Sequence, residues 1–304
     1  MSRRGGAGEW RGRGSRHGRR ERACGRSQTV RGRKLASELR RLRERAGLTT
    51  EEAAAQLGQG WSRFKVAYIE RAKTKPTTPA IIAMLDLYGV DSATRAALIE
   101  LAKNSWRRGW WTDYSDIFKG SYLALEDDAA RIDEWSPQLI PGLLQTDEYA
   151  REIIRAGQRD DEAGIDRRVR ARMARKALLS RKDPPAPMLT AVLDEAALRR
   201  PIGGPHVMRG QLNALLDATR RPNVTVRVLP LEVGTHAGLD GPFIILGFPE
   251  DIAPDVAHAG TRLGDAFAES AEIIRRIKVD FESLKSVALS PEASTELIAV
   301  IAKE

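Results

Sequence analysis

The sequence has little of what marks exported, membrane-spanning or metal-binding proteins. Cys24 is its only cysteine, so no internal disulfide can form. It has no run of 18 apolar residues, no signal-peptide core behind its arginine-rich start, and neither a CxxC nor an HExxH motif. These absences predict a cytoplasmic protein with no membrane contact, no metal and no cofactor.

Excess positive charge is confined to the N-terminus. Of the 50 basic residues, 11 arginines lie in residues 1–33, and the other 39 are balanced by 39 of the 41 acidic residues. The net charge of +9 therefore belongs to this Gly/Arg-rich segment, which is too poor in apolar residues to fold. Three interpretations of the segment are open: a disordered extension, an arm that grasps DNA, or an upstream stretch outside the native reading frame that makes Val30 the first residue.

Short helices are predicted at the start of the folded region, residues 34–104. In the first helix, apolar residues recur at three- and four-residue steps: Leu35, Leu39, Leu42 and Ala46. Gly47 then supplies the backbone freedom of a helix C-terminus. Thr49 and Glu52 have the spacing of a capping box, so a second helix is predicted to open there and to end at Gly58.

A third helix is predicted from the cap residue Ser62 to Glu70. Val66 and Ile69 face inward in this helix, and the remaining positions are basic or aromatic. Its free face can enter the major groove of DNA.

These three helices resemble the phage-repressor-type helix-turn-helix family, also called the xenobiotic-response-element family, from about Lys34 to Val90. The resemblance makes the third helix the recognition helix. It implies base contacts from Arg63, Phe64 and Tyr68 and phosphate contacts from Ser62, Lys65 and Thr50. Glu70 matches the family acid that pairs with an arginine of the first helix, here Arg43, which we expect to stay partly free for a phosphate.

One feature departs from the family pattern. Gln59 and Gly60 are two extra residues in the turn before the third helix, so the docking geometry is less defined than the fold. The competing interpretation is a small helical bundle whose basic residues form a solvated face. Such a bundle needs neither the capping box nor the spacing of Arg43 and Glu70.

Two more helices are predicted, one opened by Thr78 and Pro79 and one by Asp91 or Ser92. The helical periodicity then ends. We expect three tryptophans in the following segment to pack between the domains: Trp106, Trp110 and Trp111. The resulting division is a tail at 1–33, a helix-turn-helix DNA-binding domain at 34–104 and a regulatory domain at 105–304.

The second domain alternates extended runs with helices and predicts a mixed α/β fold, so that the whole chain is an α+β multidomain protein with an all-α N-terminal bundle. The expected strands are Leu189–Asp194, Val224–Leu231 and Phe243–Phe248. The expected helices are Tyr149–Ala156, Asp166–Ser180, Pro205–Thr219, Ala266–Ala288 and Pro291–Ala302. Glycines between the second and third strands predict a hairpin-like connection.

Nearly all of Trp110 to Ala302 also resembles the C-terminal domain of an actinobacterial family. The segments that carry the resemblance include RGWW, PQLIPGLLQTDEYAREIIRAG, VLDEAALRRPIGGPHVMRGQL and ALSPEAS. Members of that family are antitoxin-like transcriptional regulators, similar to the WhiJ-type developmental regulators. The resemblance implies DNA binding near the protein's own locus and a small partner protein encoded nearby. It supplies no known catalytic site or ligand.

One set of side chains is the only source of acid–base or metal chemistry: His206, His236, His258, Asp194, Glu195 and Asp240. His236 and Asp240 lie in a glycine-rich loop, where their spacing imposes no shared face. Asp194 and Glu195 are better explained as the start of a helical turn. The sequence therefore predicts no catalytic residue.

The predicted function is a sequence-specific transcriptional regulator whose second domain binds a small partner protein. Because one recognition helix covers only a few base pairs, we expect a homodimer on a double-stranded DNA operator. The alternatives are a small-molecule-sensing regulator and, more distantly, an enzyme with a DNA-binding anchor. The expected partner contacts are Leu139, Ile140, Leu143, Leu144, Leu239 and Phe243.

Overall fold

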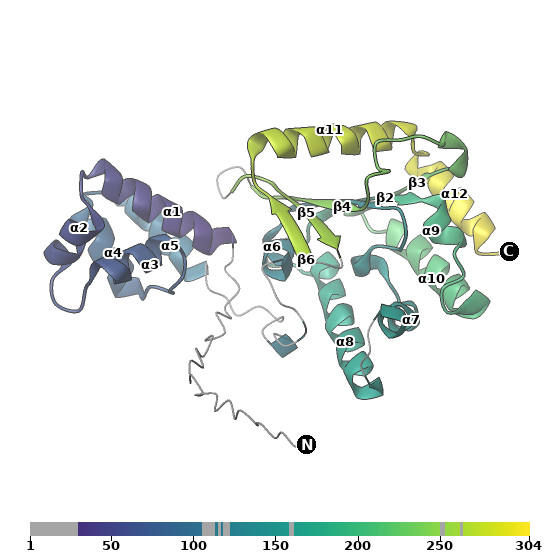
Figure 1. The fold of residues 1–304 in the computed structure, drawn as a ribbon, viewed down its shortest axis with the longest axis horizontal. Helices are drawn as coiled ribbons and strands as arrows, with labels where there is room; N and C mark the ends of the chain where they lie inside the picture. The colour runs from purple at the N-terminus through teal and green to yellow at the C-terminus, as the bar shows by residue number, and fades with distance from the viewer. Residues whose placement is uncertain are drawn as a thin grey trace, which may run out of the picture.

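The computed structural model describes residues 30–104, 113–114, 117, 122–157, 161–249, 253–261 and 264–304. An all-helical module is followed by a larger α/β domain (Figure 1), so the predicted α+β multidomain fold is confirmed. The predictions for residues 1–29 and for the three junction tryptophans lie outside the described residues.

The N-terminal module consists of five helices. They are α1 (Val30–Arg45), α2 (Thr50–Leu57), α3 (Arg63–Glu70), α4 (Thr78–Leu87) and α5 (Ser92–Asn104). Leu39, Val66 and Met84 are fully buried where α1, α3 and α4 meet. Gly47 and Gly58 end α1 and α2 with φ of 72° and 82°, a conformation that favours glycine, so both predicted helix stops are confirmed.

Two boundaries of the module differ from the prediction. Helix α1 begins at Val30, inside the segment 1–33 that was assigned to the tail. The reason is tertiary, because the Val30 side chain packs into the core of the second domain and its N–H donates to Asp128 Oδ2 at 2.8 Å. Helix α4 is capped by Thr77, one residue before the predicted cap Thr78.

The second domain contains a six-stranded mixed sheet in the order β3-β2-β1-β4-β5-β6. The strands are β1 (Arg131–Ser136), β2 (Met188–Asp194), β3 (Val224–Leu229), β4 (Phe243–Gly247), β5 (Val256–Thr261) and β6 (Gly264–Ala268). Strands β1, β2 and β3 are parallel, and β4, β5 and β6 continue the sheet antiparallel from β1.

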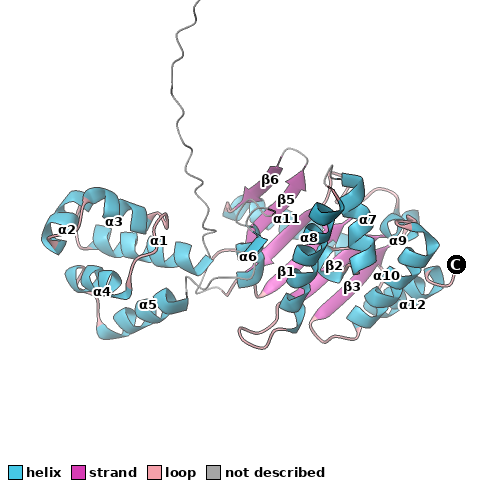
Figure 2. Cartoon of the chain, turned by 90° about the horizontal axis from the view of Figure 1, so that it is seen from below, coloured by secondary structure: helices cyan, strands magenta, loops and turns pink. Residues whose placement is uncertain are grey.

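Helices cover both faces of this sheet (Figures 1 and 2). The longer helices are α7 (Asp147–Gly157), α8 (Glu162–Arg175), α10 (Gly204–Thr219), α11 (Ala271–Val287) and α12 (Pro291–Ile301). Two short ones are α6 (Tyr122–Asp128) and α9 (Glu195–Arg199), and 3-10 turns occupy Gly142–Leu144, Lys176–Ser180 and Leu231–Val233. Successive residues of β2 face opposite sides of the sheet. Ala191 and Leu193 pack into the core with α7, α10 and α12, and Val192 packs on the other side with Phe281 of α11.

The order of the strands corrects part of the prediction. Strand β4 pairs with β1 and not with β3, so the hairpin-like connection between the second and third predicted strands is wrong. Strands β1, β5 and β6 were not predicted, because β1 carries three charged residues in RIDEWS and the other two strands are rich in alanine and glycine. The helix predicted from Ala266 begins at Ala271, because Gly264–Ala268 forms β6.

Within the described ranges, every helix falls short of the length and apolarity that a membrane span requires.

Candidate nucleic-acid interface

The capping box predicted from Thr49 and Glu52 forms at the start of α2. The Glu52 N–H donates to Thr49 Oγ1 at 3.2 Å, and the Thr49 N–H donates to Glu52 Oε2 at 2.8 Å. Both backbone donors would otherwise have no intrahelical partner. The box fixes where α2 begins, and therefore where Thr50 lies.

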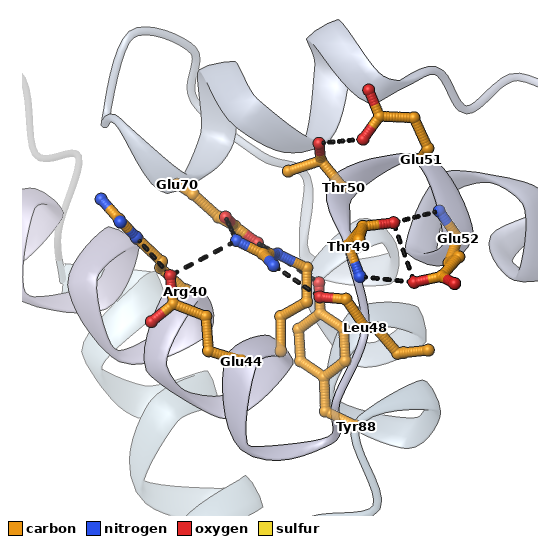
Figure 3. Close-up of polar contacts among 10 residues, drawn as sticks. Arg40, Glu44, Leu48, Thr49, Thr50, Glu51, Glu52, Glu70 and Tyr88 are labelled. Atoms are coloured by element: carbon orange, nitrogen blue, oxygen red, sulfur yellow. Dashed lines mark hydrogen bonds and ion pairs between the residues drawn. The ribbon is translucent and has the colours of Figure 1, made fainter.

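A buried ion pair holds α3 against α1 (Figure 3). Arg43 of α1 donates from Nε and Nη2 to the two carboxylate oxygens of Glu70 at the end of α3, both at 2.9 Å. The Tyr88 hydroxyl, just after α4, donates to the same carboxylate at 3.5 Å. The hydrogen bond to Glu70 raises the pKa of Arg43, and burial raises that of Tyr88. Three helices are thus joined at one carboxylate.

The predicted Arg43–Glu70 pair is present, but Arg43 is not partly free for a phosphate. Its remaining nitrogen Nη1 donates to the Leu48 carbonyl at 2.6 Å, and the residue is only 8% exposed. A guanidinium whose planar fork is already matched to a carboxylate has little left to offer a second anion. We therefore assign Arg43 to the scaffold.

The outer face of α3 presents the side chains predicted to read bases. Arg63 is 57% exposed, Phe64 57% and Tyr68 46%, whereas Val66 and Ile69 on the inner face are buried. The Arg63 guanidinium lies 4.6 Å from the Phe64 ring centroid, in cation–π contact. Large exposed aromatic side chains are unusual on an isolated module, so this face is suited to contact another surface.

An acidic residue that was not predicted lies between two of the candidate DNA contacts. Glu51 accepts a hydrogen bond from the Thr50 hydroxyl at 2.8 Å and pairs with Arg63 Nη1 at 3.1 Å. The bond from Thr50, followed by that from Arg63, lowers the pKa of Glu51. The Arg63 guanidinium is therefore paired with an acidic group in the free protein. The only sign of this pairing in the sequence is that Glu51 directly follows Thr50.

The two extra residues before α3 are part of the candidate surface. Ser62 caps α3 by accepting from the Lys65 N–H at 3.2 Å. The Lys65 ammonium donates to the Gly60 carbonyl at 3.0 Å and lies 4.3 Å from the ring centroid of Trp61. The longer turn thus folds back over the first turn of α3 and positions an exposed lysine near its N-terminus.

Two protein families match the chain. Residues 34–98 match a helix-turn-helix domain, and residues 120–300 match a family described as Domain of unknown function (DUF5753). The second match covers more than half of the 304 residues. The chain belongs to the DUF5753 family. Its helix-turn-helix domain supports a DNA-binding regulator. No curated protein and no solved structure matches the chain.

Three of the six residues expected to contact a partner belong to the core of the DUF5753 domain. Ile140, Leu143 and Leu144 are 1–2% exposed and pack in its main apolar cluster. These three expected contacts are therefore corrected to core residues. Leu139 and Leu239 are exposed, at 37% and 66%, whereas Phe243 is half-buried and packs against Phe281. The local sequence around these residues is apolar throughout, so it could not distinguish the buried ones from the exposed ones.

The histidines of the DUF5753 domain do not converge on one site. His236 packs edge-on against Trp135, with its Nε2 3.9 Å from Asp194 Oδ2, whereas His258 Nε2 lies 3.1 Å from Asp265 Oδ1. Asp194 caps α9 by accepting from the Ala196 N–H, as predicted. Among the residues that the structure describes, no group of three potential metal ligands is found.

Proposed function

We propose that the chain is a sequence-specific transcriptional regulator that inserts α3 into the major groove of a double-stranded DNA operator. The observation that carries the proposal is the contrast between the two faces of α3. The end of its inner face is held by the Arg43–Glu70 pair, and its outer face exposes Arg63, Phe64 and Tyr68. A rigid helix with an exposed guanidinium matches the geometry of direct base readout.

Each candidate contact has a separate role in this proposal. Arg63 addresses a guanine through O6 and N7, while Phe64 and Tyr68 contact thymine methyl groups. The phosphates are held by Thr50, Ser62 and Lys65, which lie at the N-terminal ends of α2 and α3 where the helix dipole also favours an anion. Glu51 keeps Arg63 extended in the free protein.

The size of the module supports binding as a homodimer. One recognition helix covers a few base pairs, so two half-sites about 34–36 Å apart are needed for useful specificity. The resemblance to antitoxin-like, WhiJ-like actinobacterial regulators supports a regulatory DUF5753 domain that binds a small protein encoded nearby, without a catalytic step. Exposed Leu139 and Leu239 are the surviving candidates for that contact.

The test compares two variants on two kinds of DNA, an operator obtained by in vitro selection and a random duplex. Arg63→Ala is expected to weaken operator binding by about 1–3 kcal/mol and to relax one base position, because a bidentate contact is lost. Lys65→Ala is expected to weaken binding to both DNAs equally. It is also expected to lower the slope of log affinity against log salt concentration by about one unit. Fluorescence anisotropy at several salt concentrations measures both effects.

Lys103→Ala, which removes an exposed charge on α5 away from α2 and α3, is the matched control and leaves both affinities unchanged. If Arg63→Ala and Lys65→Ala behave alike on the two DNAs, α3 is not the base-reading element.

A further inference from the structure

A pocket of about 270 Å³, lined by apolar side chains and by several charged ones, lies in the DUF5753 domain against the sheet. Strand β1, the turn that follows it, α8, α6 and β5 all contribute to its wall. The residues that matter for its chemistry are Tyr122, Glu134, Arg172, Arg175 and His258. Nothing in the helix-turn-helix function uses these residues.

Arg172 brings to this wall a positive charge that no carboxylate neutralises. Its Nη1 donates to Oε1 of the Gln145 side chain at 2.9 Å, and no acidic group of the described residues lies within ion-pair distance. One turn along α8, Arg175 is paired at two points with Glu126, at 2.6 and 3.0 Å. Burial, followed by repulsion from Arg175, lowers the pKa of Arg172 to about 10. Arg172 is half-buried, and a partly desolvated cation without a counterion is costly unless something else supplies the anion.

Glu134 brings a carboxyl group to the same pocket, where the nearby positive charge is that of Arg175. It accepts a hydrogen bond from the Ser136 hydroxyl at 3.0 Å and has no basic partner at ion-pair distance among the described residues. Burial raises its pKa to about 7. The pocket therefore holds one group that can bind an anion, Arg172, and one that can bind a cation, Glu134. The two do not form an ion pair with each other.

His258 adds a third incompletely satisfied group beside the pocket. Its Nε2 faces Asp265, while its buried Nδ1 has no hydrogen-bond partner within the part of the chain that the structure describes. Tyr122 and Phe267 pack against the ring and hold it in place. Native interiors satisfy most buried polar atoms, so the unpartnered His258 Nδ1, beside two charged groups that have no ion-pair partner among the described residues, points to a missing polar partner.

We propose that this pocket binds a small organic acid, with its carboxylate on Arg172 and an amine or hydroxyl group toward Glu134. A planar guanidinium is matched to a carboxylate, and a carboxyl group with a pKa near neutrality accepts a hydrogen bond from an ammonium or a hydroxyl. Leu139, Ile140 and Ile244 line the same pocket and suit an apolar body. Its volume lies near the lower end of the range of about 300–1,000 Å³ for ligand pockets and favours a ligand of amino-acid size.

The pocket is also connected to the DNA-binding module. Helix α6 contributes Tyr122 and Glu126 to the surroundings of the pocket, and its last residue, Asp128, accepts the hydrogen bond from the first residue of α1. Ligand binding is nevertheless measured without DNA, so this inference and the proposed DNA-binding function fail independently.

A matched series of probes tests the site in the full chain. Leucine carries both groups, 4-methylpentanoate lacks the amine, and leucinamide lacks the carboxylate. Thermal shift and isothermal titration are expected to show binding of leucine at millimolar concentration, weaker binding of 4-methylpentanoate, and at least tenfold weaker binding of leucinamide. Binding that stabilises the folded state raises the melting temperature by mass action.

Variants assign the binding to the pocket. Arg172→Gln is expected to lower the affinity for leucine at least tenfold. Glu134→Gln is expected to remove the preference for leucine over 4-methylpentanoate. Arg170→Gln, on the exposed face of the same helix, is the control and keeps binding. Because Arg172→Gln also alters the contact with Gln145, Arg172→Lys is measured beside it and is expected to retain weakened binding of carboxylates. The proposal is overturned if no carboxylate of the series stabilises the chain, or if Arg172→Gln binds them as the unchanged protein does.

Discussion

Arg43 in the helix-turn-helix module is a buried arginine and Arg172 in the DUF5753 domain a half-buried one, and their surroundings differ. Arg43 has a two-point pair with Glu70 and a bond to a backbone carbonyl. Arg172 has one bond to an uncharged amide. A buried charge with a full set of partners belongs to the scaffold, whereas a half-buried one without a counterion indicates a site for an external partner.

The same contrast separates the surfaces of the two regions. The module presents its candidate ligand-binding side chains outward on α3, where they suit a large polyanion such as DNA. The DUF5753 domain turns its unsatisfied polar groups into a pocket, where they suit a small ligand. Substitutions that remove one partner at each place should therefore have different consequences.

The largest effect is expected from Glu70→Ala in the module. It leaves the Arg43 charge buried and unpaired, which costs about 3–5 kcal/mol. Hydrogen–deuterium exchange of α1, α3 and α4 in the full chain measures the loss, because exchange reports the local free energy of opening. Exchange in the DUF5753 domain is expected to change much less.

The matched control for this prediction is Glu44→Ala. Glu44 pairs with Arg40 on the exposed face of α1 at 2.7 Å, and both side chains are more than half exposed. Glu44 also lies 3.8 Å from Arg43 Nη2, so the variant removes an exposed charge near Arg43 and leaves the pair with Glu70 in place. Exposed pairs contribute little to stability. Equal effects of Glu44→Ala and Glu70→Ala would show that burial of the Arg43 pair is not what stabilises the module.

The next effect is a dependence of stability on pH through Glu134. Its pKa rises from 4.5 to about 7 in the folded state, so the native protein holds an extra proton between these values and its stability falls as the pH rises through this window. Glu134→Gln is expected to remove a component on the order of 2–3 kcal/mol from this decline. Urea unfolding at pH 5 and pH 8 gives the comparison. An identical decline in both proteins would contradict the assignment.

The smallest effect is expected from Thr49→Ala. The substitution removes the side-chain half of the capping box at α2 and costs about 1 kcal/mol. Thr49→Ser is the control, since serine retains the hydroxyl. Exchange of the first amides of α2 measures the difference, and no faster exchange in Thr49→Ala would mean that the box contributes nothing to the start of α2.

The sequence was most informative where structure depends on neighbouring residues. The caps at Thr49, Ser62 and Asp194 and the glycine stops at Gly47 and Gly58 all form as predicted. Each depends on a few adjacent residues whose chemistry is visible in the sequence. The boundary at Val30 was missed because its partner, Asp128, lies 98 residues away.

The candidate DNA-binding site was therefore more predictable than the pocket. Arg63, Phe64 and Tyr68 share one face of a single helix, and helical periodicity alone brings them together. Glu51 was missed because its pairing with Arg63 requires the packing of α2 on α3. The pocket depends even more on tertiary packing, since Glu134 lies on a strand and Arg172 on a helix that are distant in sequence.

The sequence by itself determined the order of the helices in the module, the caps of α2 and α3, and the α/β class of the second domain, and its family resemblance implied the pair between Arg43 and Glu70. Only the tertiary structure decided that β4 lies beside β1, that Ile140, Leu143 and Leu144 are core, and that Arg172 has no counterion among the described residues. The physical reason is that caps and helix faces follow from local backbone geometry. Strand neighbours, burial and charge pairing depend on which distant segments pack together, because each is a property of the space around a residue.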